Sequence, residues 1–150
     1  MRKLIPLAMM LAMMTALAVP GSSSAKGDRD EYPCADPVWH SGRGIDVQYC
    51  YMWRGNVPVH ADRDPDSPVV GHLKTAKGNW FECQAEGVEY RAPKVPGNDL
   101  SGQMNNWWAA TVADNGEWGW APEAFFVNGG NDIPIGNFPD GNLAKCFEPG

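Results

Sequence analysis

Short runs in which apolar and polar residues alternate recur along the chain after residue 45. The segments 46–53, 57–61, 69–74 and 79–85 read as extended, and turn-forming Gly, Pro, Asp and Asn lie between them. Alternation with a period of two is typical of β-strands that are buried on one side. No segment of this region carries the apolar stripe of a long amphipathic helix, so the pattern predicts an all-β fold. Pro58 predicts that its strand lies at a sheet edge or ends there.

The segment 105–126 holds four of the seven tryptophans and reads NNWWAATVADNGEWGWAPEAFF. Asn115-Gly116 predicts a β-hairpin with a type I′ turn, because both central residues of that turn need a positive φ. On the first strand of the hairpin, alternation directs Trp108 to one face and Trp107 to the other. The last six letters predict a single helical turn.

Two longer segments have turn-rich or polar sequences. Residues 86–105 are polar, contain two prolines and are expected to form a long loop. Residues 129–150 are rich in Gly, Pro, Asn and Asp and are expected to form a loose tail unless Cys146 fixes it.

The beginning of the chain has a different pattern. Arg2 and Lys3 precede a sixteen-residue apolar run, 4–19, and small residues follow up to Ala25. This is the pattern of a secretory signal, and the run is shorter than the roughly 20 residues of a spanning helix. We therefore expect a signal peptide over 1–25, cleavage near Ala25 and a secreted, extracellular protein.

Charge narrows the class of partner. The net charge is −6, and it becomes −8 when Arg2 and Lys3 leave with the signal. An acidic chain without a Lys/Arg cluster is not expected to bind nucleic acid, nor a membrane after cleavage.

All four cysteines follow the signal, and an even number in a secreted chain predicts two disulfides rather than free thiols. Their spacing lacks the close pairs of a zinc site. Sequence alone allows three pairings, of which we prefer Cys34–Cys50 with Cys83–Cys146.

Catalysis and metal binding are not predicted. None of the three histidines lies in a nucleophile motif, and oxidised cysteines are not nucleophiles; the histidines are His40, His60 and His72. Alternating Asp62, Asp64 and Asp66 resemble the start of a calcium loop, but Ser67 and Leu73 stand where that loop needs Gly and Glu. We expect no enzymatic activity, no cofactor and no metal.

The aromatic residues are the informative ones, because a small domain with few aliphatic residues must use rings as its core. The residues expected in the core are Val57, Val59, Val70, Leu73, Phe81, Trp108, Val112 and Trp120. Trp80 and Trp107 have the opposite parity, so either the chain's own ends cover them or they line an open groove. The ligand-binding candidates are therefore Trp80, Tyr90 and Trp107, with His60 at the rim.

Two segments together resemble the bacterial SH3-like (SH3b) domain family of secreted Gram-positive and actinobacterial proteins. They are 57–73, VPVHADRDPDSPVVGHL, and 107–126, WWAATVADNGEWGWAPEAFF. The resemblance implies a small, half-open β-barrel that binds cell-wall or other extended peptides without catalysis. The turn at 60–66 and the long 86–105 segment depart from the family pattern, so no family-type ligand contact is carried over to the 60–66 turn.

On this basis the chain divides into a signal peptide (1–25), an N-terminal extension (26–48), an SH3-like barrel (49–128) and a turn-rich tail (129–150), with both ends tied by disulfides. We expect a secreted, non-catalytic module whose partner is cell-wall peptide, peptidoglycan or an extracellular protein. Two alternatives remain open: an inhibitor that presents 86–105 to an extracellular protease, and a structural accessory whose rings are all buried. The ligand and the oligomeric state are not specified by the sequence.

Overall fold

The computed structural model describes residues 33–127, 129–136 and 143–147, so the predicted signal peptide lies outside the described residues. The elements are β1 (Val38–His40), β2 (Ile45–Cys50), β3 (Val57–His60), β4 (Val69–Leu73), β5 (Asn79–Phe81), β6 (Gln84–Arg91), β7 (Met104–Val112), β8 (Trp118–Pro122) and a 3-10 turn, η1 (Glu123–Phe125). The all-β prediction is confirmed. No helix within these ranges is long and apolar enough to span a membrane.

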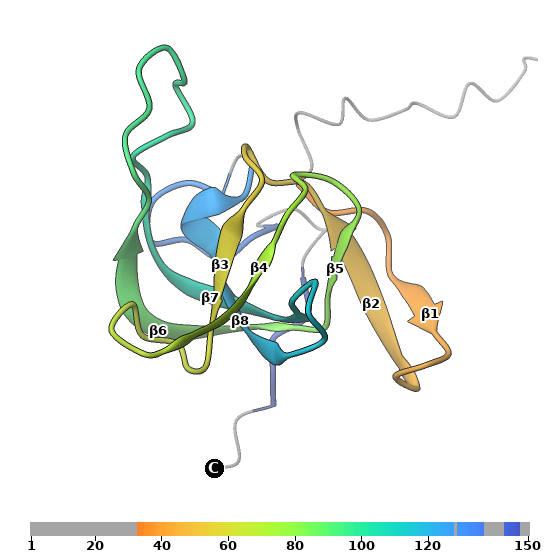
Figure 1. Cartoon of the computed structure of the whole chain (residues 1–150). Helices are drawn as coiled ribbons and strands as arrows, with labels where there is room; N and C mark the ends of the chain where they lie inside the picture. Colours follow the sequence, from red (N-terminus) through yellow and green to blue (C-terminus); the bar gives the residue numbers. More distant parts are fainter. Residues whose placement is uncertain (1–32, 128, 137–142, 148–150) are drawn as a thin grey trace, which may run out of the picture.

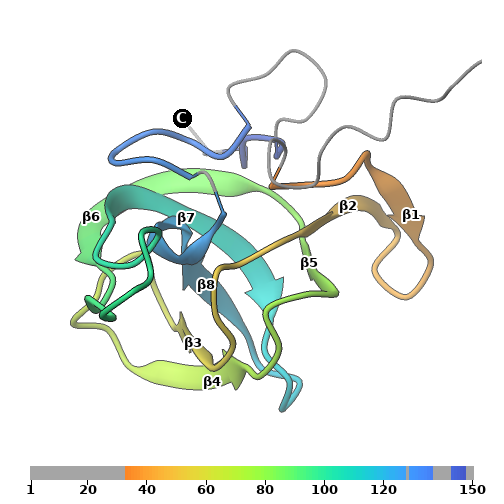
Figure 2. The ribbon, with the colours of Figure 1, turned by 90° about the horizontal axis from the view of Figure 1, so that it is seen from above.

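The strands form two antiparallel sheets (Figure 1). The larger sheet has the order β4-β3-β8-β7-β6, and the smaller has the order β1-β2-β5. The larger sheet is strongly curved, as the view from above shows (Figure 2). Its edges, β4 and β6, do not pair with each other, so the described strands form no closed barrel.

The central hairpin joins β7 and β8 with pairs from Trp108–Pro122 to Val112–Trp118, as the sequence predicted. Its turn is of a different type. The backbone N–H of Gly116 donates to the Ala113 carbonyl, and Gly116 has φ 90°, whereas Asn115 does not have a positive φ. This is a three-residue loop with Gly in the left-handed position instead of a type I′ turn.

Two other strand predictions need correction. The predicted 79–85 strand is broken after Phe81 into β5 and β6, which belong to different sheets. The first part of the predicted loop 86–105 belongs to β6, which pairs with β7 through a register shift between Glu86 and Tyr90. The bulge interrupts strict alternation, so the residue pattern of this segment does not indicate a strand.

The segment 92–103 is the true loop, and it projects from the sheets (Figure 1). Hydrogen bonds close it, from the Ala92 N–H to the Gln103 carbonyl at 2.9 Å and from the Gly102 N–H to the Pro93 carbonyl at 3.1 Å. The Ser101 hydroxyl braces its interior by bonding both backbone groups of Val95.

The strand β3 is internal and not an edge, and Pro58, its second residue, lies near the strand end, which was the other alternative predicted for it. The strand pairs with β4 along its length, but with β8 it pairs at His60–Trp120. Pro58 therefore lies where β8 has already diverged, and its missing N–H interrupts no pairing on that side.

The hydrophobic core lies inside the curve of the larger sheet. Five of the predicted core residues are buried: Val57, Val59, Leu73, Phe81 and Trp108. The other three, Val70, Val112 and Trp120, are only half-buried. Val112 pairs with the exposed Trp118 near the hairpin end, which explains its partial exposure.

Both preferred disulfides are present, Cys34–Cys50 and Cys83–Cys146. Two disulfides are typical of an oxidising, extracellular-type environment. The first attaches the N-terminal segment to β2, and β2 itself crosses the domain boundary expected at residue 49. The second attaches the tail next to β6, and two tail residues, Ile135 and Leu143, are buried in the core.

The two disulfides should stabilise the fold unequally. Their sequence separations are 63 residues for Cys83–Cys146 and 16 for Cys34–Cys50. On the chain-entropy account, replacing the first pair with serine should lower the free energy of unfolding by about 4 kcal/mol, and replacing the second by about 3 kcal/mol. Urea denaturation of the two double variants measures this, and a larger loss at Cys34–Cys50 would contradict the ranking.

Candidate functional site: a row of aromatic rings

Five rings from distant parts of the chain contact one another in sequence. Trp53 packs on Phe125 with ring centroids 5.5 Å apart, and Phe125 packs on Tyr90, also at 5.5 Å. Tyr90 meets Trp108 edge-on at 5.7 Å, and His60 lies against both of them, at 5.8 Å from Tyr90 and 5.4 Å from Trp108. We call this set the aromatic row. Its inner members are buried, whereas Trp53 and Tyr90 are half-exposed.

His60 is held at the inner end of the row. A register shift between Val59 and His60 lets both side chains face the interior, and His60 is only 3% exposed. Gly119 of β8 makes room for this turn of the chain, because a Cβ there would lie 2.3 Å from the His60 carbonyl oxygen.

The His60 ring has one nitrogen engaged and one without a partner. Nδ1 lies 3.1 Å from the Ser67 carbonyl, which can only accept, so Nδ1 carries the proton. Burial lowers the pKa of His60, although the Ser67 hydrogen bond and Asp64 oppose that shift. In the neutral ring Nε2 is therefore an acceptor, and it is buried with no hydrogen-bond partner among the described residues. A buried polar atom of this kind is costly unless something bonds it.

The outer end of the row combines flat rings with polar groups. The Trp53 indole N–H donates to the Ala124 carbonyl at 3.0 Å, which fixes the orientation of its ring. The Arg54 guanidinium lies over that ring, 5.8 Å from its centroid. Burial raises the pKa of Tyr90, and the positive charge of Arg54 partly offsets this, so the phenol stays protonated and can donate.

The four predicted ligand-binding residues do not share one surface. His60 and Tyr90 lie together in the row, as described. Trp107 is 7% exposed and is covered by Lys145 of the tail, whose Nζ lies 5.1 Å from the ring centroid.

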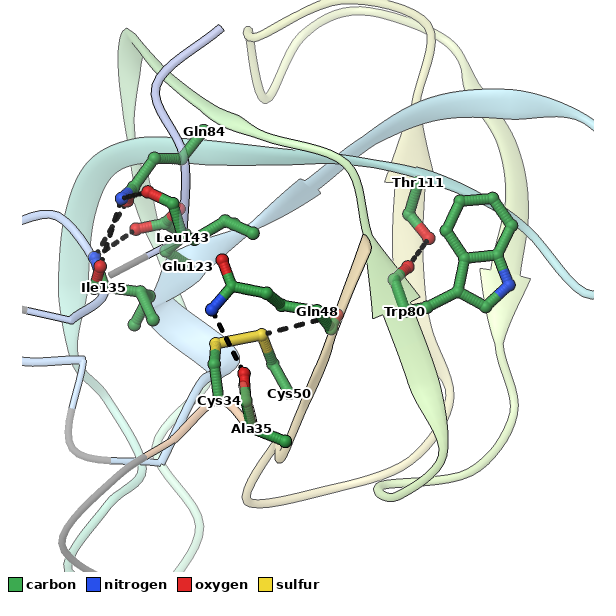
Figure 3. Close-up of a disulfide and its surroundings, with 10 residues drawn as sticks. All are labelled: Cys34, Ala35, Gln48, Cys50, Trp80, Gln84, Thr111, Glu123, Ile135 and Leu143. Atoms are coloured by element: carbon green, nitrogen blue, oxygen red, sulfur yellow. Dashed lines mark hydrogen bonds between the residues drawn. A yellow bond between two sulfur atoms is a disulfide. The ribbon is translucent and has the colours of Figure 1, made fainter. Parts of the chain in front are cut away.

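Trp80 lies in the smaller sheet and is half-exposed. Its ring packs against His40 of the N-terminal hairpin at 4.8 Å, and its carbonyl accepts from the Thr111 hydroxyl at 2.7 Å (Figure 3). The N-terminal hairpin thus contacts Trp80 and the tail covers Trp107, which favours the first of the two alternatives that strand parity left open, cover by the chain's own ends.

A buried polar cluster fixes the tail (Figure 3). The Ile135 backbone N–H donates both to Glu123 Oε2 at 3.0 Å and to Gln84 Oε1 at 2.9 Å. The Gln84 amide in turn donates to the Ile135 and Leu143 carbonyls. Glu123 is fully buried, its Oε1 has no partner among the described residues, and burial raises its pKa to about 8.

The acidic loop after β3 uses its polar groups internally. The Asp64 carboxylate accepts from the Asp66 N–H, and the Ser67 hydroxyl bonds the carbonyls of Asp62 and Asp64. Within the described ranges, no three His, Cys, Asp or Glu side chains gather as a metal site.

Protein-family models, curated proteins and solved structures yield no match to this chain. The resemblance to SH3-like domains therefore stays a prediction, and the functional argument depends on the residues themselves.

Glu123 should make stability depend on pH. Its pKa of about 8 in the folded protein exceeds its ordinary value of 4.5, so between these values the folded state holds the extra proton. Its contribution is therefore complete below pH 4.5 and is lost as pH rises through about 8, by up to about 1.4 kcal/mol per pH unit.

Urea denaturation at pH 5, 6.5 and 8 measures this slope. Glu123→Gln, which keeps the shape and the neutral charge, should reduce the fall in stability with pH, whereas Glu89→Gln on exposed β6 should leave it unchanged. An equal slope in Glu123→Gln and the parent chain would contradict the assignment.

Proposed function

We propose that this chain is a secreted, non-catalytic binding module of SH3-like type that captures extended peptides, including cell-wall stem peptides, along the aromatic row. The observation that carries the proposal is the continuity of the row, from half-exposed Trp53 and Tyr90 to buried His60, whose Nε2 has no hydrogen-bond partner among the described residues.

The row offers what an extended peptide needs. Flat rings supply contact area at low cost in conformational entropy, and they have no sequence-specific demand. The Tyr90 hydroxyl and the Arg54 guanidinium stand at the exposed end as donors for peptide carbonyls or carboxylates. His60 Nε2 is an acceptor at the inner end but is buried, so the half-exposed rings Trp53 and Tyr90 make the direct contacts with the peptide.

The fold agrees with the proposal in its general architecture. A curved, five-stranded antiparallel sheet with a projecting loop and a 3-10 turn after the Gly-Trp strand suits the SH3-like pattern in the sequence. Two disulfides suit a protein that works outside the cell, as the predicted signal peptide implies.

The test is co-sedimentation of the chain from Lys26 onward with purified peptidoglycan. Tyr90→Ala should weaken binding about tenfold, equivalent to about 1.4 kcal/mol. Tyr90→Phe and Arg54→Gln, which keep the core packing, should each weaken it severalfold. Trp39→Ala is the matched control, because Trp39 is 66% exposed but lies on β1, in the other sheet.

Glycan strands stripped of their stem peptides distinguish peptide from sugar recognition. We expect little binding to them. Equal binding to stripped and intact material, or unchanged binding by Tyr90→Ala and Arg54→Gln, would reject the proposal.

A second candidate function is favoured by the projecting loop 92–103. Its closed base and the Ser101 brace hold the segment Val95–Leu100 away from the sheets, which is how inhibitory loops are presented to a protease (Figure 1). An extracellular protease inhibited by the chain should lose that inhibition when 95–100 is replaced by a Gly/Ser segment of equal length. Retained inhibition would show that the loop is not the inhibitory segment.

A further inference from the structure

A second surface of the molecule contains a pocket that the aromatic row does not use. Its volume is about 320 Å³, near the lower end of the range for small-ligand sites. It is lined by Arg63, Gln84, Ala85, Glu86, Trp107, Lys145 and Cys146. The described lining residues thus combine one indole, two cations and one carboxylate.

Lys145 is fixed in place by the backbone on both sides of it. The Gln84 N–H donates to the Ala144 carbonyl at 2.7 Å, and the Cys146 N–H donates to the Gln84 carbonyl at 2.9 Å. The disulfide Cys83–Cys146 adds a covalent link at the same point. The Lys145 ammonium lies over the Trp107 ring at the pocket wall, and Lys145 is exposed to solvent.

Arg63 brings a second cation to the pocket in a fixed orientation. Its Nη1 donates to the Glu86 carbonyl at 2.8 Å, and its guanidinium lies over the Trp120 ring at 5.1 Å. Among the described lining residues, Glu86 is the one acid beside the cations Arg63 and Lys145, so the formal charges of these three side chains sum to a positive value, although the whole chain carries −6. A positive pocket on an acidic protein selects anions from its surroundings.

The geometry points to a binding site for the carboxylate of a short peptide or small organic acid in this pocket. The carboxylate pairs with the Lys145 ammonium on the side of Arg63, and the apolar part of the ligand contacts the Trp107 ring. The disulfide and the two backbone bonds hold the backbone at Lys145 before the ligand arrives, so only the Lys145 side chain loses conformational freedom at this point on binding. The charge of Glu86 opposes the ligand and limits its affinity. This inference is independent of the peptide binding proposed for the aromatic row.

The test uses acetyl-Ala-Ala with a free carboxylate and its C-terminal amide as paired probes, titrated into the ¹⁵N-labelled chain. The indole N–H signal of Trp107 should shift in a saturable way with the acid, with a Kd of about 1 mM. The amide should bind at least tenfold more weakly, and added salt should weaken binding of the acid.

Lys145→Met keeps the stem over the ring but removes the charge, so it should weaken binding of the acid about tenfold, whereas Lys145→Arg should retain it. Lys77→Met is the matched control, because Lys77 also lies over a ring, that of Tyr51, at 5.8 Å, outside the pocket. Glu86→Gln should tighten binding of the acid two- to threefold, because it removes the opposing charge.

The assignment would be overturned by equal affinity for the acid and the amide, or by the absence of a saturable Trp107 shift at 20 mM probe. It would also be overturned if Lys145→Met had no effect or if Glu86→Gln bound the acid more weakly. Tyr90→Ala separates the two sites, since it should weaken binding at the row about tenfold and leave the Trp107 shift unchanged.

Discussion

The strand β7 carries apolar or aromatic side chains on both faces, and each face needs its own cover. Trp108 is covered from the side of Tyr90 and His60, through ring contacts inside the curved sheet. Trp107 faces the opposite way and is covered by the tail, which the disulfide to Cys83 holds in position. The rest of the structure follows from this double burial. The tail is a structural layer of the domain, and the polar cluster around Gln84 and Glu123 is where that layer is attached.

The two candidate sites lie where these covers are incomplete. On one side the rings that pack around Trp108 continue outward to Tyr90 and Trp53, which no element of the described chain covers completely. On the other side the tail crosses Trp107 but leaves a pocket beside Lys145. The candidate binding surfaces thus lie at the margins of the buried parts of the sheet, where aromatic and charged side chains meet.

Local sequence features predicted much of this fold. Asn115-Gly116 marked the central hairpin, the strand parity of Trp107 and Trp108 was correct, and the disulfide pairing followed the preferred option. The parts of the structure that the sequence did not predict depend on contacts between segments far apart in the chain. The bulge in β6 hides its alternation, and the contact between His60 and Tyr90 requires the curvature of a whole sheet. The parallel bridge from Gln84 to Lys145, which brings the tail over Trp107, has no local signal in either segment. Sequence therefore identified two residues of the aromatic row, His60 and Tyr90, as ligand candidates, but it did not identify their neighbours Trp53, Arg54 and Phe125.

The long disulfide also has a consequence for biogenesis. Cys146 follows Cys83 by 63 residues, so during synthesis β7 emerges well before the segment that shields its second face. Before that segment is in place, the Trp107 indole lacks its Lys145 cover, and exposed aromatic surface of this kind makes a folding chain prone to aggregate. The Cys83–Cys146 disulfide thus joins a segment that is synthesised late to the strand that it covers, and it places Lys145 beside Trp107.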